Sequence, residues 1–184
     1  MSGRPPSIRR ARSGDEAQVL SFIRELAAYE RLEGEVTADT ASLGEHLFGD
    51  HPFAEVLLAE DDGDAAGFAL YFFTFSTFLA RPTLYLEDLF VRPEKRGRGI
   101  GEALLRTLAA IAVERGCGRM EWSVLDWNEP ALRFYAKLGA KPMSEWTVQR
   151  LTGDALLACA RGADARVEGD DGSNTLTSRS GRST

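Results

Sequence analysis

The sequence is poor in the residues that bind metals and form disulfides. Its 184 residues include two cysteines, Cys117 and Cys159, and two histidines, His46 and His51, without a CxxC motif or a Cys/His cluster. We therefore predict no metal site. The chain also lacks an apolar run near the ~20 residues that cross a membrane, and its first ten residues lack the apolar core of a signal peptide. Together these absences predict a protein of the reducing cytoplasm with no membrane partner.

Basic residues are outnumbered by acidic ones. The chain has 28 acidic and 22 basic residues, which gives a net charge of −6. Because nucleic acid binding requires a basic surface, we predict no nucleic acid partner. The acidic balance fits a cationic substrate, and it equally fits an ordinary solvated surface.

The length suits one domain with a substantial core. From about residue 162 the chain is nearly all Gly, Ser, Thr, Asp and Arg, and such a segment cannot bury enough apolar surface to offset its chain entropy. We expect a flexible leader at residues 1–6, a domain at residues 7–161 and a disordered polar tail at residues 162–184.

Hydrophobic periodicity and turn signals predict a mixed α/β layer protein rather than a doubly wound sheet. We expect strands at residues 7–11, 83–91, 118–125 and 145–151, and two more within residues 53–78. We expect helices at residues 38–48, 128–138 and 153–160, and a first one that begins at a capping box of Ser13 and Glu16. Another helix is expected within residues 92–116, after a loop, with Ile100, Leu104, Leu108 and Ile111 as its buried stripe.

A glycine-rich stretch, RPEKRGRGIG, lies between an expected strand and an expected helix. Gly97, Gly99 and Gly101 would let the backbone turn tightly and present N–H groups to an anion at the start of the helix. The stretch is neither a nucleotide P-loop, since no Lys-Ser/Thr pair follows, nor the dinucleotide pattern G-x-G-x-x-G. A tight turn without a ligand remains the alternative, although it has no use for four nearby cations.

The pattern R-x-x-G-x-G, from Arg96 to Gly101, resembles the pyrophosphate loop of the GCN5-related N-acetyltransferases. Further blocks resemble the diamine (spermidine/spermine) and thialysine N-acetyltransferases of that superfamily, namely IRELAAYE, DHPF, GFALYFFT, LYLEDLFV, RGRGIG and WNEPALRFYAKLGA. The resemblance covers residue 7 to about 160. The segment between Gly139 and Trp146 is shorter than is usual in that subfamily, and the tail has no counterpart there.

This resemblance implies an α+β fold with a mixed, mostly antiparallel central sheet, helices on both faces and a splayed strand pair that binds acetyl-CoA. The coenzyme residues that it implies are Leu89, Phe90, Val91, Arg96, Gly97, Arg98, Gly99, Ile100, Gly101, Glu102, Asn128, Glu129, Pro130 and Ala131. The amine-binding residues that it implies are Tyr29, Glu30, Glu87, Glu121, Trp122, Ser123 and Glu145. Asn128 also fits a plain helix cap, and Glu33 fits a solvated acidic surface.

Acetyl transfer to an amine requires a base, an oxyanion donor and an acid for the departing thiolate. Glu87 and Asp88 are adjacent on one expected strand, which would point them to opposite faces. The resemblance favours Glu87 as the base, Tyr135 as the acid and an N–H near Leu89 as the oxyanion donor. The alternatives are a pair of exposed carboxylates and a tyrosine at the edge of the core.

The leading hypothesis is therefore an acetyl-CoA-dependent N-acetyltransferase that acts on a small cationic amine, such as a diamine, a polyamine or thialysine. The family also implies a homodimer, often with C-terminal strands exchanged or packed across the interface. A lysine or N-terminal protein acetyltransferase is the alternative within the class. A non-catalytic acetyl-CoA sensor is the alternative outside it, and Glu87 and Tyr135 argue against it because a sensor needs neither base nor acid.

Overall fold

The computed structural model describes residues 5–161, so the predicted tail at 162–184 and most of the leader lie outside the described residues. The chain divides into two compact units, one that ends at Arg133 and one that begins at Phe134. Each unit is described by itself below.

The first unit contains a five-stranded sheet with the strand order β1-β2-β3-β4-β5. The strands are β1 (Ser7–Arg10), β2 (Glu55–Asp61), β3 (Asp64–Ser76), β4 (Arg81–Val91) and β5 (Arg119–Trp122). The pairs β1–β2, β2–β3 and β3–β4 are antiparallel, and β4–β5 is parallel. This confirms the prediction of a mixed, mostly antiparallel sheet.

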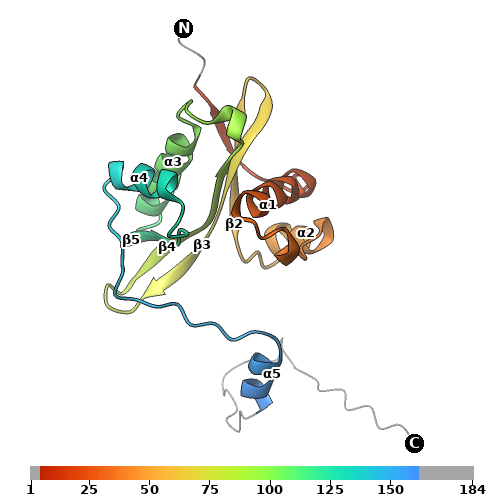
Figure 1. Ribbon diagram of the computed structural model, residues 1–184, viewed down its shortest axis with the longest axis vertical. Coiled ribbons are helices and arrows are strands. Elements are labelled where there is room, and N and C mark those ends of the chain that lie inside the picture. Colours follow the sequence, from red (N-terminus) through yellow and green to blue (C-terminus); the bar gives the residue numbers. More distant parts are fainter. Residues whose placement is uncertain (1–4, 162–184) are drawn as a thin grey trace, which may run out of the picture. The chain divides into compact units, whose positions relative to one another are not determined.

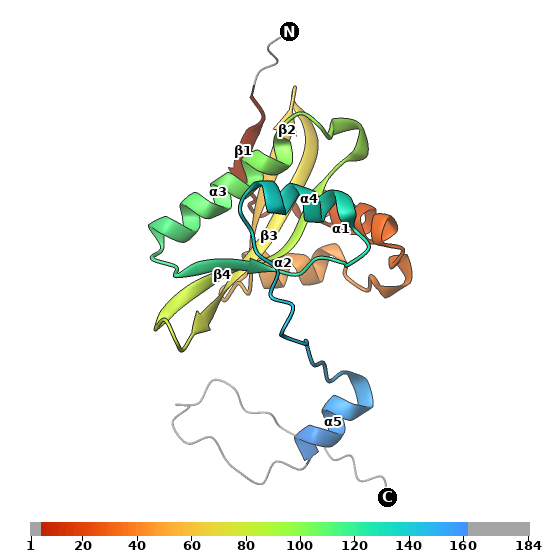
Figure 2. The ribbon, with the colours of Figure 1, turned by 60° about the vertical axis from the view of Figure 1, so that its left-hand side comes forward.

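Helices cover both faces of this sheet, as predicted. The long helices are α1 (Glu16–Glu30), α2 (Thr40–Phe48) and α3 (Ile100–Glu114), and short 3₁₀ turns occur at η1 (Glu33–Glu35) and η2 (Pro93–Lys95). Figure 1 shows α1 and α2 on one side of the strands and α3 on the other, and Figure 2 shows α3 lying across the strands. Because both faces are covered, β2 is buried along a nearly continuous run rather than on alternate residues.

The core beneath α1 is organised around aromatic rings. Phe22 of α1 stacks on Phe68 of β3 with ring centroids 5.4 Å apart, and it also packs against Phe90 of β4 at 6.4 Å. All three side chains are buried. Phe90 therefore anchors the C-terminal end of β4 in the core, immediately before the glycine-rich loop.

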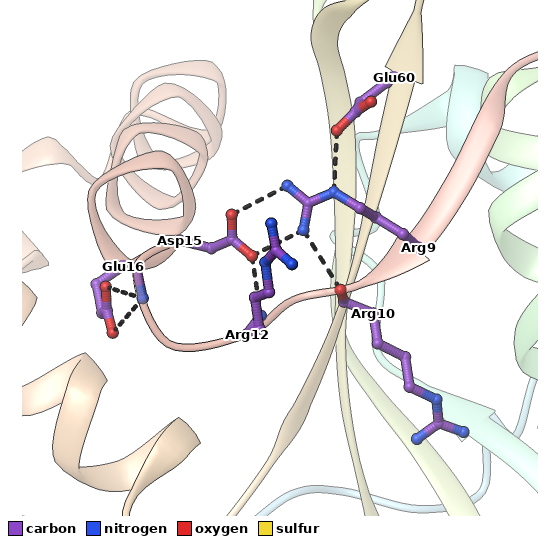
Figure 3. Close-up of polar contacts among 7 residues, drawn as sticks. Arg9, Arg10, Arg12, Asp15, Glu16 and Glu60 are labelled. Atoms are coloured by element: carbon purple, nitrogen blue, oxygen red, sulfur yellow. Dashed lines mark hydrogen bonds and ion pairs between the residues drawn. The ribbon is translucent and has the colours of Figure 1, made fainter.

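An ion-pair corner joins β1 to the start of α1 (Figure 3). Arg9 donates to both carboxylate oxygens of Asp15, at 2.7 and 3.0 Å, and to Glu60 at 3.0 Å. The hydrogen bonding from Arg9 holds the pKa of Asp15 below its ordinary value. Asp15, not Ser13, is the residue that precedes the helix, and Glu16 accepts from the N–H of Gly14. The predicted capping box of Ser13 and Glu16 is therefore wrong, because α1 begins at Glu16, two residues later than a cap at Ser13 requires.

Two more helices follow β5, α4 (Glu129–Lys137) and α5 (Gly153–Arg161), close to the predicted ranges. The strand predicted at residues 145–151 is wrong, because this segment forms neither strand nor helix in the single chain. Its apolar residues are exposed, with exposed fractions of 74% for Trp146, 79% for Val148 and 54% for Leu151. Alternation alone could not reveal this, since a strand also needs a neighbouring strand to satisfy its backbone.

Candidate active site

The glycine-rich loop leads from β4 through η2 into α3. Gly97 and Gly99 have φ angles of 77° and 81°, in the left-handed region that favours glycine. Gly99 precedes the helix, and the first hydrogen bond of the helix runs from the N–H of Ala103 to the carbonyl of Gly99. The preceding N–H groups, from Ile100 to Glu102, have no acceptor one turn back. This helix start can therefore bind an anion through its backbone.

The Ile100 side chain has another role. It is 1% exposed and belongs to the core, so Ile100 can offer a ligand only its backbone. Glu102, in the first turn of α3, pairs with Arg106 at 2.7 Å.

Most of the cations around this loop are already paired inside the protein. Arg92 makes two hydrogen bonds to Glu25, at 2.9 and 2.7 Å. Lys95 and Arg98 both contact Asp61, at 3.2 and 2.7 Å. Three of the four cations therefore hold the loop through internal ion pairs. The prediction that a turn alone has no use for them is wrong for these three.

Arg96 is the fourth cation, and it has no carboxylate partner among residues 5–161. Its Nε donates to the carbonyl of Val91 at 2.9 Å, and its guanidinium carbon lies 4.7 Å from the centre of the Tyr29 ring. It also lies 5.8 Å from the centre of the Phe90 ring. Stacking fixes the direction of the guanidinium without neutralising it, so Arg96 keeps its charge for an anionic ligand.

Tyr29 connects three of the predicted site segments. Besides stacking with Arg96, its hydroxyl donates to Oδ1 of Asn128 at 3.2 Å, and its ring packs 6.1 Å from that of Trp127. Asn128 Oδ1 also accepts from the N–H of Ala131 at 3.3 Å, so Asn128 does cap α4. The structure thus brings a predicted amine residue, Tyr29, together with two predicted coenzyme residues, Arg96 and Asn128.

The strands β4 and β5 separate at the middle of β4. Their pairing runs from Thr83 with Arg119 to Leu86 with Trp122 and stops there. Beyond Leu86, β4 continues to Val91 with β3 as its only strand partner among the described residues. Backbone groups of residues 87–91 that point away from β3 are consequently free of a strand ladder. This is the splayed strand pair that the family resemblance implied.

The separation coincides with a bulge at Glu87. Tyr71 of β3 faces Leu86, and Leu70 faces Asp88, so Glu87 has no residue opposite it. The strict alternation behind the prediction that Glu87 and Asp88 point to opposite faces is therefore interrupted. Glu87 is exposed, and Asp88 is half-buried.

The charges of Glu30 from α1 and Glu87 from β4 both act on Asp88 of β4, and we name these three carboxylates the acidic cluster. Burial raises the pKa of Asp88 to about 6, and the charges of Glu87 and Glu30 contribute in the same direction. Burial also raises the pKa of Glu30 above its ordinary value. No role of its own was predicted for Asp88 from the sequence. Its burial and the nearby charge of Glu30 in α1 depend on the fold and are not visible in the chain. A cation is the ligand that would relieve this repulsion.

The remaining predicted residues fall into two groups. On the β5 side, Glu121 pairs with Arg119 at 3.0 Å, Ser123 shares a hydrogen bond of 2.9 Å with Tyr85, and Trp122 is half-buried. Glu129 pairs with Arg133, and Pro130 is exposed.

In the second unit, Tyr135 is half-buried with its ring centre 5.3 Å from that of Phe134, and Glu145 is exposed.

Across residues 5–161 no group of three or more His, Cys, Asp or Glu could hold a metal ion. In the same part of the chain, no helix is long and apolar enough to cross a membrane.

The anion site can be tested with Gly99→Glu, which adds a negative charge and left-handed strain at the start of α3. We expect coenzyme A to bind roughly 30–150-fold more weakly, the cost of losing a charge-assisted contact of about 2–3 kcal/mol. Calorimetry on the folded variant measures this. Gly116→Glu is the matched control, because Gly116 has a φ of 68° and open space around it at the other end of α3. The control should lose similar stability and bind normally; unchanged binding by the Gly99 variant would contradict an anion site.

The acidic cluster predicts an unusual dependence of stability on pH. Asp88 binds its proton more tightly in the folded protein, so its ionisation costs stability as pH rises from 3.8 to about 6. Asp88→Asn should therefore raise the free energy of unfolding at pH 7, by at most roughly 3 kcal/mol, and should change it little at pH 3. Urea unfolding at both pH values measures the difference. A variant that is less stable than the parent at pH 7 would show that the Asp88 carboxylate is stabilised rather than strained.

Comparisons with known proteins agree with this geometry. The model of the acetyltransferase (GNAT) family matches residues 20–140. A thialysine N-epsilon-acetyltransferase of Bos taurus is 40% identical over 160 residues, which cover 81% of this chain and 94% of that protein. The spermidine/spermine N(1)-acetyltransferase-like protein 1 of Homo sapiens is 34% identical over 163 residues, covering 83% of this chain and 23% of that protein.

Among solved structures, an integron cassette protein from the mobile metagenome of V. cholerae is similar, with a TM-score of 0.73 and 29% identity. The match covers 86% of this chain and 99% of that one. An aminoglycoside acetyltransferase from an uncultured soil sample shares the fold at 21% identity and a TM-score of 0.65. The family match, the relatives and the splayed strand pair lead to one conclusion: the chain belongs to the acetyltransferase (GNAT) family.

Proposed function

We propose that this protein uses acetyl-CoA to acetylate a small cationic amine of the diamine, polyamine or thialysine class. The observation that carries the proposal is the acidic cluster next to the splayed strand pair. The names of the relatives, which refer to thialysine and to spermidine and spermine, support the same class. We further propose that residues 7–161 make up the functional domain.

In this proposal the coenzyme lies between the glycine-rich loop and the free side of β4. The N–H groups from Gly97 to Glu102 and the guanidinium of Arg96 bind the pyrophosphate. The backbone groups of residues 89–91 that point away from β3 bind the pantetheine arm. Residues 128–131 complete the site, with the amide of Asn128 held by Tyr29. An N–H near Leu89 receives the carbonyl oxygen of the thioester as negative charge develops on it.

The amine binds at the acidic cluster as an ammonium ion. An alkylammonium has a pKa near ~10, so a base must remove a proton before the nitrogen can attack the thioester. We assign this role to Glu87, which the bulge leaves exposed. Glu30 and the ring of Tyr29 hold the rest of the cationic chain, and Glu121, Trp122 and Ser123 contribute to the same site.

After attack, the carbon–sulfur bond breaks and the thiolate takes up a proton. We assign this proton to Tyr135, because a phenol is a weak acid of a basicity close to that of a thiolate. The alternative role for Tyr135 is packing within α4, in keeping with its half-buried ring beside Phe134.

We also propose a homodimer in which the C-terminal segments exchange or pack across the interface. Residues 145–151 support it, because they alternate like a strand while Trp146, Val148 and Leu151 are exposed in the single chain. β5 is the last strand of the sheet among the described residues, and an edge strand is a position at which another chain can add a strand. Light scattering at micromolar concentration distinguishes a dimer from a monomer.

The substrate class is tested by measuring the specificity constant for spermidine, thialysine, a lysine peptide and a neutral aryl amine under identical conditions. A second positive charge near Glu30 should be worth about 1–3 kcal/mol, or roughly 5–150-fold in specificity. Glu30→Gln should therefore weaken the use of dications far more than that of a simple monoamine. Glu33→Gln, at an exposed acid in η1, is the matched control and should have little effect.

These measurements also separate the alternatives. If the lysine peptide is the best substrate, the enzyme is a protein acetyltransferase, and the assignment to small amines fails. If no amine is acetylated although acetyl-CoA binds, the protein is a sensor, and the catalytic assignment fails as well.

The acid is tested with Tyr135→Phe, which removes only the hydroxyl. Turnover should fall by roughly 10²–10⁴-fold, as expected when a general acid is lost, while coenzyme affinity and thermal stability stay close to those of the parent. Single-turnover kinetics isolate the chemical step from product release. A reduction of less than threefold in that step would assign Tyr135 to packing.

A further inference from the structure

The turn between β2 and β3 reaches the glycine-rich loop. β2 ends at Asp61 and β3 begins at Asp64, and the two residues between them, Asp62 and Gly63, have φ angles of 57° and 87°. Two left-handed residues in a row make the tightest hairpin turn, for which Asp-Gly is a favoured sequence. The turn brings Asp61 and Asp64 within reach of Lys95.

Asp61 is the only buried charged residue in the described part of the chain, with an exposed fraction of 7%. Its Oδ2 accepts from Arg98 at 2.7 Å and from Lys95 at 3.2 Å, and its carbonyl oxygen lies 3.4 Å from the same Lys95 nitrogen. The hydrogen bond from Lys95 and the charges of both cations hold the pKa of Asp61 below its ordinary value, so the carboxylate is ionised at neutral pH.

These contacts fasten the loop on both sides of Gly97. Lys95 ends the 3₁₀ turn η2, and Arg98 lies between the two left-handed glycines. A loop with two such glycines has many conformations open to it, and ordering them costs entropy when a ligand binds. A loop that is already held in place loses less conformational entropy when the ligand binds.

We propose that Asp61 is a positioning residue for the pyrophosphate loop. By holding Lys95 and Arg98 it keeps the N–H groups from Gly97 to Glu102 converging on one point, and it does so without touching the coenzyme. The charge of Asp61 is compensated by Lys95 and Arg98, and Asp64 also lies near Lys95, so neither aspartate leaves an uncompensated negative charge beside a pyrophosphate. This inference rests on the proposed use of acetyl-CoA.

The experiment compares acetyl-CoA with S-acetylpantetheine, which lacks the pyrophosphate. In Asp61→Asn the Michaelis constant for acetyl-CoA should rise about tenfold or more, as when charge-assisted hydrogen bonds are lost, while the turnover number changes by less than about twofold. Use of S-acetylpantetheine should stay at the parent value. Asp64→Asn is the matched control, because its side chain is 75% exposed and only 3.5 Å from Lys95 at its closest. This control should behave like the parent with both donors.

A second variant covers the case in which Asp61→Asn does not fold. Lys95→Met removes one of the two ion pairs from the loop side, and it should weaken coenzyme A binding, measured by calorimetry, by a smaller factor. Equal losses with both acetyl donors would assign Asp61 to the overall fold and overturn the proposal. Unchanged or tighter binding of coenzyme A would overturn it too. A parent protein that does not use acetyl-CoA would contradict the proposed function instead.

Discussion

The short pairing of β4 with β5 is the constraint on which the rest of the site depends. The two strands are paired from Thr83 to Leu86 only, so the second half of β4 is held from one side by β3. Phe90 compensates by packing into the aromatic core with Phe22 and Phe68. The strand therefore stays in place while its other edge remains open. An open edge inside a protein would be costly without a ligand or water to satisfy it, which is why this edge is suited to a substrate.

Charge is distributed so that one part of the site suits an anion and another a cation. Around the loop, Glu25 and Asp61 pair with Arg92, Lys95 and Arg98, so these charges are used for structure. The N–H groups of the α3 start and Arg96 remain for an anion. On β4 and α1 the opposite holds, because no ion pair within residues 5–161 includes a member of the acidic cluster, and because burial and the charges of Glu87 and Glu30 raise the pKa of Asp88. The overall charge of −6 describes neither part.

Tyr29 lies at the junction between these two parts. Its ring carries the Arg96 guanidinium on one side, and its hydroxyl holds the amide of Asn128. Glu30, the next residue in α1, belongs to the acidic cluster. A single turn of helix thus contacts the loop and the segment before α4, and its Glu30 acts through its charge on Asp88 of β4. Transfer between two bound substrates requires them to be held in a fixed relation, and a rigid element that contacts both parts provides it.

The sequence by itself determined the elements with strong local signals: the amphipathic helices, the strands of the sheet, the glycines of the loop and the family to which the blocks belong. These depend on side-chain periodicity and on backbone conformations that few residues adopt. Tertiary structure decided the features that depend on distant partners. Lys95 and Arg98 pair with an aspartate more than 30 residues away. The pKa of Asp88 is raised by burial and by the charges of Glu87 and of Glu30 in α1, and Asp15 rather than Ser13 precedes α1. The bulge at Glu87 and the exposed segment at 145–151 also depend on distant partners. Strand pairing requires a second strand, and the position of that strand in space cannot be seen in the order of residues.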